Sequence, residues 1–112
     1  MDNAGKKEAV RNYKERKQLQ GVFAIRCDAS GEIWTGFSPN LDAHQNREWF
    51  TLRSGLHRNK AMQAAWNAHG DASFRYEIVE EVTDDNPLLI PALLKDREKH
   101  WRAKLSAAAV TG

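Results

Sequence analysis

Basic side chains are concentrated in a few segments of the sequence, where they could bind phosphate groups. Between residues 47 and 60 one acid, Glu48, is accompanied by four basic residues, namely Arg47, Arg53, Arg58 and Lys60. Residues 95–104 hold five basic residues against two acidic ones. Such groups on one face attract phosphate, although charge clusters on helices are also ordinary solvated surface. The uneven distribution, more than the net charge of +2, favours nucleic acid as a partner.

Several other functions have no sequence motif to support them. The chain contains no GxxxxGK loop, paired CxxC, HExxH or GxSxG motif, which argues against P-loop, structural-zinc, zinc-protease and serine-esterase chemistry. The single cysteine, Cys27, cannot form an internal disulfide and is expected to pack in a strand. No apolar run is long enough to span a bilayer and no secretory signal is visible, so we expect a cytoplasmic protein.

Apolar spacing and turn residues predict the elements that must position these side chains. Residues 21–27 and 32–37 predict a β-hairpin, and residues 74–82 alternate as a third strand. Helices are predicted over residues 4–18, 40–54, 59–69 and 91–105, several of them bounded by Asn before the start or Gly after the end.

The predicted order αββααβα indicates an α+β domain in which helices flank a small three-stranded antiparallel sheet. We expect residues 1–20 to form a helical extension, residues 21–106 the domain and residues 107–112 a frayed tail. A chain of 112 residues can bury an adequate core as one domain.

Two short motifs in the predicted hairpin resemble the GIY-YIG nuclease superfamily. They are Gly21-Val22-Phe23 and Trp34-Thr35-Gly36, with eleven residues from Phe23 to Trp34, and an Asn-Leu pair then opens a helix. Segments 59–70, 74–80 and 97–101 look like the corresponding helix, third strand and final helix, so the resemblance spans about residues 21–105. Its β-β-α-α-β-α order equals the one reached independently from periodicity.

The resemblance implies a metal-dependent phosphodiesterase that cuts nucleic acid, with DNA favoured over RNA. Glu98 occupies the position of the family's metal ligand, for one Mg²⁺ or Mn²⁺ ion, and His57 that of a histidine found in some members. A hard divalent cation needs only oxygen ligands and keeps most of its waters, so one carboxylate with substrate phosphate suffices. Glu98 is also spaced to pair with Arg102 at i,i+4, which is the purely structural interpretation.

Three other positions depart from the family pattern. Phe23 and Trp34 stand where the family has tyrosines, and His44 stands where it has arginine. Phe23 has no hydroxyl, and the Trp34 indole N–H donates but cannot accept a proton. Because an imidazole can gain or lose a proton near neutral pH, His44 could serve as a general base when neutral or as a weak phosphate clamp when protonated.

Two interpretations of these departures stay open. In the first, the site is rearranged: His44 activates water, Arg47 or Arg53 holds the phosphate, Glu98 holds the metal, and Trp34 donates or stacks. In the second, the chain is a nucleic-acid-binding module that has lost cleavage. A third function, a protein-interaction domain, would use the acidic segment 77–85, which has five acids and no base. We expect a monomer or weak dimer.

Overall fold

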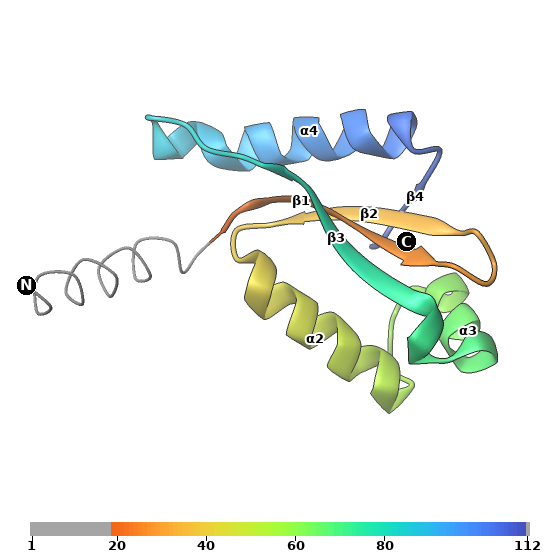
Figure 1. Cartoon of the computed structure of the whole chain (residues 1–112). Coiled ribbons are helices and arrows are strands. Elements are labelled where there is room, and N and C mark those ends of the chain that lie inside the picture. The colour runs from red at the N-terminus through yellow and green to blue at the C-terminus, as the bar shows by residue number, and fades with distance from the viewer. Residues whose placement is uncertain (1–18, 112) are drawn as a thin grey trace, which may run out of the picture.

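The computed structural model describes residues 19–111, which form a four-stranded sheet between two layers of helix (Figure 1). The strands are β1 Gly21–Cys27, β2 Ile33–Ser38, β3 Phe74–Glu81 and β4 Ala108–Ala109. The helices are α2 Leu41–Ser54, α3 Lys60–His69 and α4 Ile90–Lys104, with short 3-10 turns η1 Asp71–Ser73 and η2 Pro87–Leu89. The helix expected over residues 4–18 lies outside the described residues.

The helices begin and end where the sequence predicts them. The Asn40 side chain accepts a hydrogen bond from Ala43 N–H at the start of α2, and Asn59 does the same for Met62 at the start of α3. Gly55 ends α2 in the left-handed conformation. Between residues 19 and 111, every helix is too short or too polar to cross a membrane.

The strand order is β3-β1-β2-β4, with β1 antiparallel to both β2 and β3. The prediction of three strands is wrong by one, because Ala108–Ala109 adds to the edge of β2 as a short parallel strand. The expected frayed tail is instead held in place by buried Val110, whose N–H donates to Thr35 O over 2.8 Å. Asn59 Nδ2 also donates to Ala109 O and Val110 O. A run of alanines has neither β-branched residues nor alternation, so its sequence gives no strand signal.

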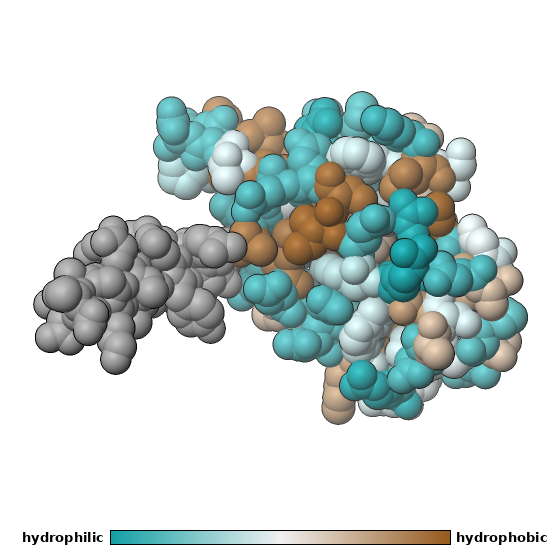
Figure 2. Space-filling view, in the orientation of Figure 1, coloured by the Kyte–Doolittle hydropathy of each residue, from teal (hydrophilic) through white to brown (hydrophobic). Residues whose placement is uncertain are grey.

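The strand alternation assigns side chains to two different cores. Phe23, Ile25 and Trp34 face the layer of α2 and α3, where they join the main hydrophobic cluster. Figure 1 shows α4 on the opposite face of the sheet, where Thr35 of β2 meets it. The face drawn in Figure 2 is mostly hydrophilic, with an apolar patch near its centre. The two faces of β2 therefore lead to different helices.

Close approach of neighbouring groups explains the two motif glycines. A Cβ added at Gly21 would lie 2.0 Å from the carbonyl oxygen of Glu80, close to the register shift that β1 and β3 show between Val22 and Phe23. A Cβ at Gly36 would lie 2.5 Å from Cζ of Phe23. The Phe23 ring cannot easily withdraw, because it stacks on Tyr76 with centroids 5.0 Å apart and contacts His44 at 4.5 Å.

We expect Gly36→Ala to lower the free energy of unfolding by about 1–3 kcal/mol, the range for forcing extra atoms into a filled core. Urea denaturation followed by circular dichroism measures it. Combining Gly36→Ala with Phe23→Leu should cost less than the sum of the two single changes, because the smaller side chain vacates the contested space. An unchanged urea midpoint for Gly36→Ala would contradict this account of the motif.

Candidate functional site

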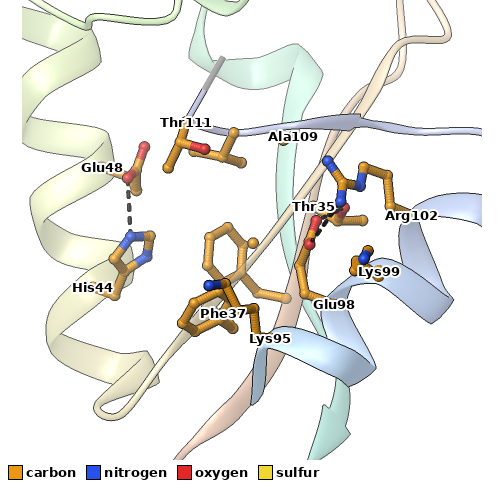
Figure 3. A pocket seen from close by; sticks show the side chains of 13 residues that line it. Thr35, Phe37, His44, Glu48, Lys95, Glu98, Lys99, Arg102, Ala109 and Thr111 are labelled. Carbon is orange, nitrogen blue, oxygen red and sulfur yellow. Dashed lines mark hydrogen bonds and ion pairs between the residues drawn. The ribbon is translucent and has the colours of Figure 1, made fainter. Parts of the chain in front are cut away.

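A cavity of about 540 Å³ opens beside the edge of β2, between α2 and α4. Figure 3 shows His44 and Glu48 of α2 on one side and Glu98, Lys99 and Arg102 of α4 on the other. Its remaining walls come from the strands and from the C-terminal segment that follows β4. Two of the residues selected from sequence, His44 and Glu98, therefore share a cavity although they lie on opposite helical layers.

Glu98 is a buried carboxylate, only 6% exposed, that two neighbours hold in place. Thr35 Oγ1 donates a hydrogen bond of 2.9 Å to its Oε2, and Arg102 Nη2 lies 3.3 Å from its Oε1. The pairing with Arg102 is the i,i+4 contact expected from sequence. Each carboxylate oxygen has two lone-pair sites, so both keep one acceptor position after these contacts.

Basic side chains surround the carboxylate on the same helix. Lys95, Lys99 and Arg102 line the cavity at i, i+4 and i+7, which places them along one face of α4. Among the described residues, neither lysine has an ion-pair partner. Sequence reasoning noted the basic content of residues 95–104 but did not select these three. The cavity wall around Glu98 is therefore electropositive, which favours an anionic ligand.

On the opposite wall, Glu48 accepts hydrogen bonds from two histidines. His44 Nε2 lies 3.0 Å from Oε2 and His57 Nε2 lies 2.5 Å from Oε1. Asn59 N–H donates to Nδ1 of His57 over 3.0 Å, so His57 carries its proton on Nε2 and donates it to Glu48. Sequence reasoning missed Glu48, although its i,i+4 spacing from His44 was a usable signal.

The electrostatic state of this wall follows from burial and hydrogen bonding. Burial alone would raise the pKa of the Glu48 carboxyl, but the hydrogen bonds from His44 and His57 outweigh burial and leave that pKa below its ordinary value. Behind His44, the Tyr76 hydroxyl donates to Leu41 O over 3.3 Å and lies 3.5 Å from His44 Nδ1. Burial, and then the negative charges of Glu48 and Asp42, raise the pKa of Tyr76 far above its ordinary value. Its phenol stays protonated.

The two residues that replace the motif tyrosines lie in different places. Phe23 is part of the cavity lining, where its ring presents no polar group. Trp34 is 2% exposed and stacks on Phe74 within the core, with ring centroids 6.1 Å apart. The structure does not bring Trp34 into the cavity. Its indole ring is therefore not accessible to donate a hydrogen bond to a substrate or to stack on one.

The remaining basic candidates do not line this cavity either. Arg47 and Arg58 line a neighbouring hollow of about 330 Å³, in which His57 also takes part. Arg53, in the last turn of α2, and Lys60, the first residue of α3, line neither space. The basic side chains closest to Glu98 are thus those of α4, and the four selected from sequence divide into a pair in the hollow and a pair outside it.

The fold has counterparts among solved structures. No protein-family model and no curated protein matches the sequence. The catalytic domain of the homing endonuclease I-TevI matches with a TM-score of 0.67 and 23% identity, over 78% of this chain and 88% of that one. A mutant of the catalytic domain of the intron endonuclease I-TevI matches with the same TM-score of 0.67 and 22% identity, over 79% and 84% of the respective chains. At such identities the likeness is one of fold: the chain adopts the GIY-YIG-like fold of the I-TevI catalytic domain.

Proposed function

We propose that this chain is an endonuclease that hydrolyses phosphodiester bonds in nucleic acid, with DNA ahead of RNA, in the cavity between α2 and α4. The observation that carries the proposal is the position of Glu98. Its buried carboxylate faces a cavity that has basic side chains on the same wall and a carboxylate-bound histidine on the other. The likeness to a nuclease catalytic domain supports this use of the cavity.

The basic residues of α4 supply the attraction for substrate. A phosphodiester carries one negative charge, and Lys95, Lys99 and Arg102 present cationic groups to the space it would occupy. Arg102 is shared with Glu98 and is about one-third exposed, so its remaining N–H groups are free to face a phosphate oxygen. In the proposal, these three residues of α4 hold the phosphate, a role that the sequence analysis assigned to Arg47 or Arg53.

A divalent ion fits the oxygen chemistry of Glu98. No cluster of three or more His, Cys, Asp or Glu side chains with metal-binding geometry occurs between residues 19 and 111. Mg²⁺ and Mn²⁺ do not require such a cluster, since one carboxylate with water and phosphate oxygens is enough. The free acceptor positions of Glu98 suit one such ion, which when bound neutralises negative charge on the phosphoryl oxygens. Thr35 keeps the carboxylate oriented towards that position.

We propose His44 as a general base, with Glu48 as its positioning residue. Because the Glu48 carboxylate accepts from His44 Nε2, the proton of neutral His44 resides on Nε2 and the lone pair on Nδ1. The contact of Nδ1 with the Tyr76 hydroxyl is 3.5 Å, at the long limit of a hydrogen bond, so this lone pair is weakly engaged. In the proposal, His44 takes a proton from water through this nitrogen.

A second function is favoured by one specific observation, the apolar ring of Phe23 in the cavity wall. General acid–base groups contribute about 10²–10⁴-fold each to rate, and Phe23 supplies none. A chain that binds nucleic acid in the same cavity without cutting it would need the cations of α4 but neither Glu98 nor His44. Cleavage assays therefore distinguish the two functions.

The deciding experiment compares Glu98→Gln with Asp96→Asn, an exposed position on the same helix that lies outside the cavity. Each protein is incubated with single- and double-stranded DNA and with RNA, in Mg²⁺, in Mn²⁺ and in EDTA. We expect the unmodified chain and Asp96→Asn to cleave only with a divalent ion, and Glu98→Gln to lose about 10²-fold or more in rate. Binding in EDTA should survive in all three proteins.

The other outcomes have fixed meanings. Binding without cleavage under every condition would replace the nuclease with the binding module. Cleavage that Glu98→Gln leaves unchanged would remove Glu98 from the site, and absence of binding would remove nucleic acid as the partner.

Glu48→Gln tests the positioning of His44. An amide cannot accept from both histidines, so we expect cleavage to fall while DNA binding in EDTA changes little. Stability gives a second readout: since the pKa of Glu48 is lowered by folding, its stabilising contribution is complete above the ordinary value of 4.5 and disappears as the pH falls through the lower folded value.

The difference in unfolding free energy between the unmodified chain and Glu48→Gln should therefore shrink as the pH is lowered below about 4.5, which denaturation at several pH values measures. Glu81→Gln, at an exposed position of β3, controls for loss of a carboxylate elsewhere. A gap that stays constant with pH would contradict an ionised Glu48 held by the histidines.

A further inference from the structure

We infer that the hollow beside the cavity is a second phosphate subsite, which holds a neighbouring phosphodiester of the same nucleic-acid strand. The inference rests on the proposed function, because it extends the substrate beyond the cavity. It assigns Arg47 and Arg58 to a phosphate other than the one next to Glu98, and it leaves Arg53 and Lys60 without a part in binding.

The hollow brings together two guanidinium groups from different elements. Arg47 lies on α2, and Arg58 lies in the connection between α2 and α3. Both side chains are exposed, and among residues 19–111 neither has an ion-pair partner. Two arginine side chains that line one space of about 330 Å³ suit a phosphate group, which accepts guanidinium N–H donors in pairs.

The hollow and the cavity lie next to each other. Both are lined by Glu48, Val110 and Thr111, so the segment after β4 separates them only as a shared wall. Figure 3 shows Thr111 beside Glu48 at the edge of the cavity, across from Arg102. Val110 is buried and held by Thr35 and Asn59, so this wall has a defined position. A strand that leaves the cavity past Thr111 arrives at the arginine pair.

Glu48 at the junction would repel a polyanion if its charge were exposed. Both of its oxygens accept from histidines, and its side chain is only 13% exposed. The N–H groups of His44 and His57 therefore already occupy the charged oxygens of Glu48 when a phosphate approaches. The junction is compatible with a strand that carries a phosphate on each side of it.

Two separate cationic spaces favour a ligand with regularly repeated phosphates. A ligand with one phosphate group can occupy either space but gains nothing from the other. A nucleic-acid strand has a phosphate at every nucleotide, so one strand can place a phosphate in the cavity and another in the hollow at the same time. This is why the inference commits to a polynucleotide that extends from the cavity.

The test uses two double variants that remove the same charge from the same region. Arg47→Gln with Arg58→Gln changes the hollow, whereas Arg53→Gln with Lys60→Gln changes exposed positions outside it, one on α2 and one at the start of α3. Binding of a fluorescent twelve-nucleotide single-stranded DNA by the full chain is measured in EDTA over a range of salt concentrations. Circular dichroism and thermal melting verify that both variants fold.

We expect the variant of the hollow to bind about tenfold or more weakly, and its plot of log affinity against log salt to lose about 0.7 to 1 in slope, the value for one phosphate contact. The control should keep the slope of the unmodified chain and lose much less affinity. Equal losses in the two variants would overturn the subsite and leave the proposed nuclease intact, since a net-charge effect would then explain both.

A second measurement separates the subsite from the cavity. The Lys95→Gln, Lys99→Gln variant removes cations from the cavity wall, and it should lower affinity independently of the hollow, so that the effects on log affinity add when the two pairs of changes are combined. If the combined protein binds no worse than the Lys95→Gln, Lys99→Gln variant, the hollow holds no phosphate. If the unmodified chain binds no DNA, both the subsite and the proposed function fail.

Discussion

The hydrogen bond between Thr35 and Glu98 joins the sheet to α4 and determines where the cavity lies. A buried carboxylate is costly unless it is paired and hydrogen-bonded, and Glu98 meets this requirement only where Thr35 and Arg102 can both reach it. A shift of α4 by one turn along β2 would carry Arg102 along with Glu98 but would take the buried carboxylate away from the hydroxyl of Thr35. The contact therefore sets the helix position, and Lys95 and Lys99 face the cavity as a consequence of it.

Glu48 presents the same problem on the other helical layer, with a different solution. His44 and His57 occupy its two oxygens, and the lowered pKa keeps it ionised. The two carboxylates of the cavity are thus unequal: that of Glu98 retains acceptor positions next to cations, while that of Glu48 is committed to histidines. In the proposed reaction, Glu98 would hold a divalent ion through its remaining acceptor positions, and His44 on the α2 wall would accept the proton. This asymmetry separates the two tasks of the proposed reaction.

Periodicity and capping residues were sufficient to predict α2, α3, α4 and three strands, because each has a local signal. The i,i+4 pair of Glu98 with Arg102 was predictable for the same reason. Contacts between distant segments were not. Strand alternation places Trp34 on one face of β2 but does not tell which face the helices fill, and its burial follows from packing against Phe74. The segment 107–112 forms an edge strand through Val110 and Asn59, neither of which forms a recognisable pattern with it in sequence.

The strands and the helices contribute different kinds of residue to the cavity. This difference bears on the replacement of the motif tyrosines by Phe23 and Trp34. The nearest atom of Phe23 to the Gly36 position is Cζ, the carbon that would carry a tyrosine hydroxyl. The missing hydroxyl is therefore one at the cavity wall, and the next ring in the stack, that of Tyr76, turns its hydroxyl to Leu41 O instead. Strand residues thus give the cavity its shape and, through Thr35, hold Glu98 in place, while its charged groups come from α2 and α4. In the proposed reaction, a site without the motif tyrosine hydroxyls needs a helical group that can move a proton, and we assign that task to Nδ1 of His44.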